Sequence, residues 1–362
     1  MIDKRTFEKE HIQSISTTKN KKIDAKLLEK MIRAFFLLEK LVENKIELTF
    51  KGGTSLLLLN EDFNRLSIDI DIITKTDKQD LEKVFPNIIQ QGAFVNWEED
   101  VRQKTSETAP VAHYKFYYQS AIDSNFGNEP VLLDVLFGNS PYSETLELRI
   151  EHRFFISSGD SLTVKTPSVD AVLGDKLTAF APTTTGILYT KNRPVEMIKQ
   201  LFDIAFLFDK ASNLQTTKTS YIKVAEEEIR FRNLQISWTD VLTDTLNACK
   251  TITFRETDNT DFKILAKGIS NIKNFIATNF SIEDAILCAA KTAWLCAAMK
   301  TININQFERY DKTTAINDLL ISEFPYTKFN KLKKTNQEAF FYWYKAINIL
   351  FPINSQLLTL NF

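Results

Sequence analysis

The spacing of apolar residues predicts a helix near the start of the chain. Between residues 26 and 43, apolar side chains recur every three or four positions with Glu and Lys between them, which is typical of an amphipathic helix. The first 25 residues show no comparable pattern, and we expect them to form a mobile lead-in. The chain therefore begins its ordered part with a helix that packs one face against a core.

The hydrophobic period changes after this helix. Residues 46–50 and 66–74 are predicted strands, and the adjacent pair Gly52 and Gly53 predicts a turn between the first strand and a short helix over 54–60. These segments form a strand, turn, helix and strand in succession. Such a unit brings a backbone turn close to the start of the second strand.

The rest of the chain divides into a mixed part and a helical part. A further helix is predicted over 78–91, and β-branched and aromatic residues predict strands over 93–97, 112–120, 131–137 and 149–156. From Pro167 onward the pattern is helical, with predicted helix starts at Ser168, Pro194 and Ser281. We therefore expect an N-terminal helical segment over 1–45, one mixed domain over 46–165 and an all-helical domain over 166–362.

Composition and charge exclude several classes of protein. With 44% hydrophobic and 25% charged residues among 362, the chain has the composition of a folded globular protein. A net charge of −1 provides no global basic field for nucleic acid, so any such surface is local. The longest apolar run, 293–299, is far shorter than the roughly 20 residues that span a bilayer. Together with a charged N-terminus, this favours a cytoplasmic protein without a membrane partner.

Candidate chemistry lies in the second predicted strand. Side chains two apart share a face of a strand, so Asp69 and Asp71 point together, away from the isoleucines at 68, 70 and 72. Arg65 and Ser67 are expected on the same face as the two aspartates. Neighbouring carboxylates repel unless a cation neutralises them, and hard oxygen ligands suit Mg²⁺. The pattern predicts a metal site, although a lone Asp-x-Asp pair is also common at a solvated strand edge.

The Gly52-Gly53 turn is a candidate phosphate site. Backbone N–H groups are available between a strand and a helix, and the helix dipole favours an anion there. The hydroxyls of Thr54 and Ser55 can add donors, and Arg65 can pair with a phosphate or hold the loop in place. The turn and the paired aspartates together predict a site for a nucleoside triphosphate (NTP) with magnesium.

These residues resemble a known family. The Gly-Gly-Thr-Ser-Leu stretch that begins at Gly52 and the Arg-x-Ser-x-Asp-Ile-Asp stretch that ends at Asp71 are similar to the AbiEii/AbiGii toxin branch of the DNA polymerase β-like nucleotidyltransferase superfamily. The resemblance covers about residues 35–210. It implies an α+β fold, in which a polymerase β-like core of mixed sheet and flanking helices carries an N-terminal helix and a large C-terminal all-helical domain.

The resemblance also implies a third carboxylate on a later strand. Asp134 is the candidate, because it lies in the apolar run 132–137, where an unpartnered carboxylate would be costly. A strand-end or turn aspartate is the alternative reading. With Asp69 and Asp71 it completes the expected ligand set for Mg²⁺, for which two sites are implied.

Two further residues of the helical part are implied by the same resemblance. Lys176 lies on the apolar stripe of its predicted helix, where either an anion or a snorkelling position satisfies it. Asp203 lies in a helix that is apolar nearly all round, and its partner is either Lys199, Lys176 or the nucleotide pocket. The chain departs from the branch at Gln200, where an aspartate is frequent.

The remaining polar candidates carry less information. The histidines at 11, 113 and 152 show no ligand or triad spacing, and we expect each to be structural or to lie on the surface. The basic residues near the end are read as a solvated face that a tRNA backbone can also use; they are Lys328, Lys331, Lys333 and Lys334.

The resemblance implies a Mg²⁺-dependent nucleotidyltransferase that moves a nucleotide from an NTP to an acceptor hydroxyl. The leading acceptor is the tRNA 3′ end, in a toxin–antitoxin or phage-defence system with a cognate antitoxin. A protein or small-molecule acceptor, or a catalytically silent nucleotide-binding interaction protein, are the alternatives. The expected catalytic residues are Asp69, Asp71, Asp134, Lys176 and Asp203. The expected nucleotide-binding residues are Gly52, Gly53, Thr54, Ser55, Arg65, Ser67 and Lys176.

Overall fold

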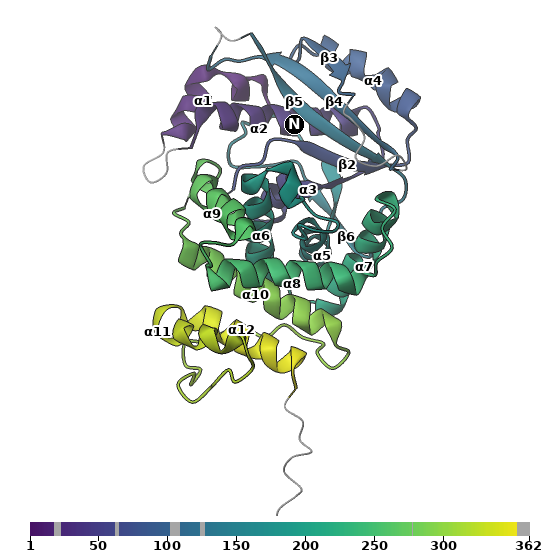
Figure 1. Cartoon of the computed structure of the whole chain (residues 1–362). Helices are drawn as coiled ribbons and strands as arrows, with labels where there is room; N and C mark the ends of the chain where they lie inside the picture. The colour runs from purple at the N-terminus through teal and green to yellow at the C-terminus, as the bar shows by residue number, and fades with distance from the viewer. Residues whose placement is uncertain (18–22, 62–64, 102–108, 124–126, 277, 353–362) are drawn as a thin grey trace, which may run out of the picture. The chain divides into compact units, whose positions relative to one another are not determined.

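The chain folds into two compact units. The computed structural model describes residues 1–17, 23–61, 65–101, 109–123, 127–276 and 278–352. One unit, here called the sheet unit, comprises Met1–Val172 and Lys273–Asn279, and the other, the helical unit, comprises Leu173–Ile272 and Phe280–Phe362. Figure 1 shows the strands in blue to teal and the later helices in green to yellow.

The sheet unit is built on a mixed sheet of seven strands in the order β3-β4-β5-β2-β1-β7-β6. Strand β2 pairs antiparallel with β1 and parallel with β5, and β1 pairs parallel with β7. The fold is therefore α+β, as expected. The strands are β1 (Leu48–Lys51), β2 (Ile70–Thr74), β3 (Asn96–Glu99), β4 (Val111–Gln119), β5 (Asn128–Phe137), β6 (Thr145–Arg149) and β7 (Thr163–Pro167).

Helices α2 and α4 cover one face of this sheet. Phe85 of α4 packs edge-on against Tyr114 and Phe116 of β4, and Phe35 of α2 packs against Phe50 of β1. Alternate residues along each strand must then point to the opposite face. The helices of this unit are η1 (Lys4–Phe7), α1 (Lys9–Ser16), α2 (Ala25–Glu43), α3 (Gly52–Leu59) and α4 (Lys78–Gln90).

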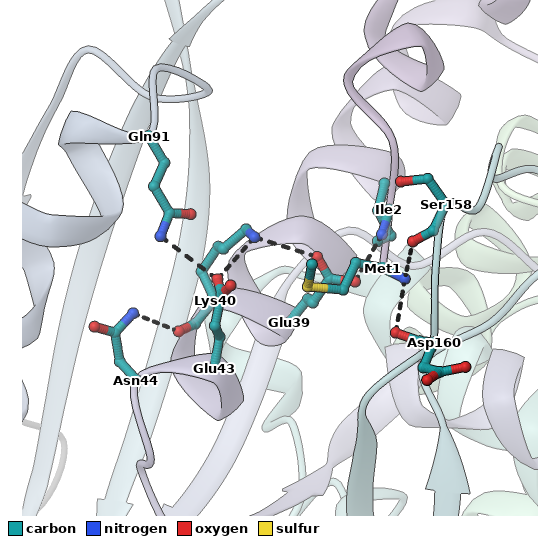
Figure 2. Close-up of polar contacts among 9 residues, drawn as sticks. All are labelled: Met1, Ile2, Glu39, Lys40, Glu43, Asn44, Gln91, Ser158 and Asp160. Atoms are coloured by element: carbon teal, nitrogen blue, oxygen red, sulfur yellow. Dashed lines mark hydrogen bonds and ion pairs between the residues drawn. The ribbon is translucent and has the colours of Figure 1, made fainter.

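The expected mobile lead-in is wrong for the described residues before α2. The backbone N–H of Ile2 donates to Glu39 Oε2 of α2 at 2.7 Å, and the Met1 amino group donates to the carbonyl oxygens of Ser158 and Asp160 (Figure 2). Glu39 is fully buried, so this hydrogen bond helps to offset the cost of removing its carboxylate from water. Long-range contacts, which local periodicity does not report, order this segment.

The predicted strand over 149–156 is also wrong. The strand ends at Arg149. Ile150 and Phe154 are buried, but they lie in a bend and a turn and not in a strand. Strand β6 is an edge strand with several exposed residues, so it does not show the alternation that a half-buried strand requires. Strand β7, which pairs with it, alternates exposed and buried residues over 163–166 but was not predicted from the sequence. The other predicted strands differ from the observed ones mainly at their ends.

The helical unit begins within helix α5. The predicted starts are confirmed: the Ser168 hydroxyl accepts from Ala171 N–H, Pro194 is the first residue of α6, and Ser281 and Asp284 form a capping box at α10. No described helix is long and apolar enough to cross a membrane. The helices that follow the sheet are α5 (Val169–Ala179), η3 (Tyr189–Lys191), α6 (Pro194–Lys210), α7 (Leu214–Phe231), α8 (Trp238–Phe254), α9 (Thr260–Asn271), η4 (Ile272–Asn274), α10 (Ile282–Lys300), η5 (Tyr326–Lys331), α11 (Leu332–Thr335) and α12 (Gln337–Leu350).

Candidate active site

Four polar residues form a row across four adjacent strands. In the backbone register, Lys51 of β1 pairs with Asp71 of β2, Asp71 pairs with Asp134 of β5, and Asp134 pairs with His113 of β4. Residues paired in this way project from the same face of a sheet. Their sequence neighbours Phe50, Ile72 and Tyr114 are buried on the face that α2 and α4 cover. The row therefore lies on the opposite face.

Gly52 lets the backbone approach the carboxylate of Asp71. A Cβ atom on Gly52 would overlap the Asp71 carboxylate, and the φ of Gly52 is +79°, a conformation that other residues rarely adopt. Helix α3 begins at this residue, directly after Lys51. The site thus places a helix N-terminus beside an aspartate of the sheet.

The hydroxyls that follow the glycines hold this turn together. Thr54 Oγ1 donates to the carbonyl oxygen of Asp69 at 2.6 Å, and Ser55 Oγ donates to that of Gly52 at 2.9 Å. Both side chains are fully buried. In this structure they tie α3 to the segment that leads into β2. Asp69 itself directly precedes β2 and is half-buried.

Arg65 and Ser67 lie against Gly53. A Cβ atom on Gly53 would lie 2.6 Å from Arg65 Nη2 and 2.8 Å from Ser67 Oγ. Arg65 is 3% exposed, and its Nη1 donates to the carbonyl oxygen of Leu66 at 3.3 Å. The structure therefore brings these two predicted residues to the same turn as the glycines.

His113 is a residue of this face that the sequence patterns did not identify. Its Nδ1 lies 2.8 Å from Asp134 Oδ1, and the two side chains are 25% and 29% exposed. One signal was present: the polar residues of β4 alternate with Ala112, Tyr114 and Phe116, so His113 belongs to the polar face of its strand. What the sequence did not reveal is that β4 is the neighbour of β5.

The carboxylate pair has the chemistry of a magnesium site. Among the described residues, no group of three or more His, Cys, Asp and Glu side chains is gathered closely enough to hold a metal ion. Mg²⁺, however, is usually bound by one or two carboxylates together with water and substrate phosphates. Asp71 and Asp134 are direct neighbours on adjacent strands and supply such a pair. The residues present thus fit a cation that is shared with a phosphate ligand.

Lys176 and Asp203 meet within the helical unit. Lys176 Nζ lies 3.0 Å from Asp203 Oδ2 and donates to Gln200 Oε1, also at 3.0 Å. Both members of the ion pair are buried. Of the alternatives for Asp203, the structure shows the pair with Lys176, while Lys199 lies 3.9 Å from Glu196.

Comparison with known proteins supports one family. The sequence profile described as nucleotidyl transferase AbiEii toxin, type IV toxin–antitoxin system, matches residues 36–282. Solved structures that are similar to this chain include JHP933 from Helicobacter pylori, with 15% identity, a TM-score of 0.44, and coverage of 77% of this chain and 95% of that one. Another is an antigenic nucleotidyltransferase-like protein from Paracoccidioides brasiliensis, with 15% identity, a TM-score of 0.36, and coverage of 59% and 96%. No curated protein matches the chain.

Proposed function

Because this chain belongs to the AbiEii nucleotidyltransferase toxin family, we propose that it transfers a nucleotide from an NTP to an acceptor hydroxyl at the sheet face that carries Asp71 and Asp134. The observation that carries this proposal is the register pair of these two carboxylates beside Gly52. Two adjacent acids, a glycine turn and a helix N-terminus are the parts needed to hold a polyphosphate with its counterion.

Each part of the face has a distinct task in the proposal. Asp71 and Asp134 hold Mg²⁺, and Asp69, which directly precedes β2, joins them. The bound cation neutralises charge on the phosphates. The backbone N–H groups at Gly52 and Gly53, at the N-terminus of α3, donate hydrogen bonds to phosphate oxygens.

The remaining predicted residues support this turn. Arg65 and Ser67 lie beside Gly53, within reach of an anion bound there, and the hydroxyls of Thr54 and Ser55 hold the turn in shape. Lys176 and Asp203 enter the proposal through the family resemblance alone. Their observed pairing is consistent with a buried structural element of the helical unit.

We propose the tRNA 3′ end as the acceptor, an antitoxin encoded with the chain as its partner, and the cytoplasm as the place of action. The family's description as a toxin of a type IV toxin–antitoxin system supports the antitoxin. The tRNA acceptor is the finer claim and depends on the experiment below. A protein or small-molecule hydroxyl is the competing acceptor.

The test is a transfer assay with each α-³²P-labelled NTP in turn, with Mg²⁺, against purified total tRNA and against total cellular protein. We expect label in tRNA, lost with Asp71→Asn and Asp134→Asn and retained with Asp258→Asn, a matched change at an exposed aspartate of the helical unit. Label only in protein would assign a protein acceptor. Nucleotide binding without transfer to any fraction would identify a catalytically silent interaction protein.

A further inference from the structure

We propose that His113 is a positioning residue for Asp134, which it holds in the orientation that binds the divalent cation. The inference rests on the proposed function, because it concerns the same pair of carboxylates. It starts from one contact: His113 Nδ1 and Asp134 Oδ1 are 2.8 Å apart, across directly paired residues of β4 and β5. This is a short, well-formed hydrogen bond.

The direction of this hydrogen bond follows from its acceptor. An ionised carboxylate only accepts, so Nδ1 of His113 carries the proton and donates it to Asp134. A carboxylate rotates easily about its Cβ–Cγ bond, since that torsion has a broad energy profile. The donor on the neighbouring strand restricts the rotation and thereby fixes which way the oxygens of Asp134 face.

The location of His113 argues for a role in ligand binding over a role in packing. Its side chain is 25% exposed and projects from the face opposite the helices, whereas Ala112 and Tyr114 on either side of it are buried. A histidine with a purely structural role in the core would instead project from the buried face, as Ala112 and Tyr114 do. Hydrogen bonds from such outer residues to metal-binding carboxylates commonly change metal affinity or activity by about 10- to 100-fold when removed.

The same row places His113 at one end and Lys51 at the other, with the two acids between them. The acids thus lie between Lys51 on β1 and His113 on β4, all on one face of the sheet. On the β4 side the nitrogen donor is the imidazole ring, because the register pairs it directly with Asp134. In the register of β4 and β5, His113 is the residue that lies directly opposite Asp134.

Three variants of His113 separate positioning from packing. The amide nitrogen of Asn can take the place of Nδ1, whereas that of Gln takes the place of Nε2, and Ala removes the donor altogether. We expect Mn²⁺ binding, measured by electron paramagnetic resonance on the full chain with Mn²⁺ alone, to weaken by about 10- to 100-fold in His113→Ala and His113→Gln. His113→Asn should restore most of the affinity.

Val111→Ala is the matched control, because it truncates an exposed residue two positions earlier on the same strand. It should leave Mn²⁺ affinity unchanged. Circular dichroism confirms folding, and the comparison of the Asn and Gln variants decides the question even if the Ala variant unfolds. Equal Mn²⁺ affinity in the wild type and in His113→Gln, with affinity lost in Asp134→Asn, would overturn the role of His113 alone. Equal weak binding by the wild type and Asp71→Asn would overturn the proposed function with it.

Discussion

Lys176 and Asp203 satisfy each other inside the helical unit, where Nζ and Oδ2 lie 3.0 Å apart and both side chains are buried. For each residue, the sequence predicted a partner of opposite charge, because burying an isolated charge on an apolar helix face costs free energy. Gln200 accepts a further hydrogen bond from Lys176. The amide of Gln200 and the carboxylate of Asp203 therefore share the ammonium group of Lys176.

This pair predicts strongly non-additive effects on stability. Lys176→Met or Asp203→Leu alone removes one member of the buried ion pair and should lower the free energy of unfolding by about 3 to 5 kcal/mol. The double variant should lose much less than the sum of the two. Urea unfolding of the four proteins measures the coupling, with Lys345→Met, which removes one member of a partly exposed ion pair with Glu308, as a nearly neutral control. Additive losses would contradict the pairing.

Gly52 should tolerate no side chain, for two separable reasons. Gly52→Ala introduces a Cβ that overlaps the Asp71 carboxylate at a φ of +79°. Gly92 has the same φ of +79° and nothing within 4 Å of the added atom, so Gly92→Ala measures the backbone strain alone. We expect about 1 to 2 kcal/mol of destabilisation for Gly92→Ala. Gly52→Ala should cost clearly more and abolish nucleotide transfer, and equal costs in urea unfolding would show that Asp71 moves aside freely.

The carboxylate pair predicts a ligand-dependent stability. If Mg²⁺ and an NTP bind the folded chain at Asp71, saturating both should raise the free energy of unfolding by about 2.7 kcal/mol at 100 times the Kd. Thermal denaturation with and without Mg²⁺ and each NTP measures this. Asp71→Asn should keep its melting temperature unchanged by the ligands, while Asp258→Asn should respond as the wild type does. An equal rise in Asp71→Asn would place the ligand elsewhere.

His152 predicts how stability falls in acid. Burial, with a smaller effect of Arg153, lowers the pKa of His152 to about 4 from an ordinary value of 6.5. Its Nδ1 accepts from the backbone N–H of Phe154 at 3.4 Å, which requires a neutral ring. The unfolded chain therefore binds a proton between pH 6.5 and 4 that the folded chain does not, and stability falls as the pH falls.

The expected loss from this histidine is about 3 kcal/mol over that range, at up to about 1.4 kcal/mol per pH unit. Urea unfolding at several pH values measures it. His152→Asn keeps an acceptor oxygen but cannot titrate, so its stability should depend less on pH in this window, with the difference from the wild type constant between pH 7 and 8. An unchanged slope would assign the acid sensitivity to other groups.

Local sequence patterns predicted the helices and strands in which apolar residues recur regularly. They failed where contacts between distant parts of the chain determine the structure. The capped starts at Pro194 and Ser281 are encoded by a few adjacent residues, and the structure has both. The order around Ile2 depends on Glu39 of α2, which is far away in the sequence, so no local window reveals it. Edge strand β6 lacks a buried face and thus lacks the alternation by which strands are recognised.

The same distinction holds for the site. Alternation along one strand predicted Asp71 on the polar face of β2, with the buried Ile70 before it, whereas Asp69 lies just before the strand begins. The pairing of Asp71 with Asp134 follows from the order of strands, which the sequence alone left to family resemblance. The contact between His113 and Asp134 depends on a second pairing of the same kind, and the spacing of the three histidines could not suggest it.

The parallel pairing of β2 with β5 also has a consequence for when the proposed site can form during synthesis. The two acids are separated by β3, β4 and α4 along the chain, and β5 inserts between β4 and β2. During synthesis, a polypeptide that does not yet include Asp134 has only one of the two carboxylates of the proposed metal site. Under the proposed function, nucleotide transfer is therefore expected only after β5 has been synthesised and has paired with β2.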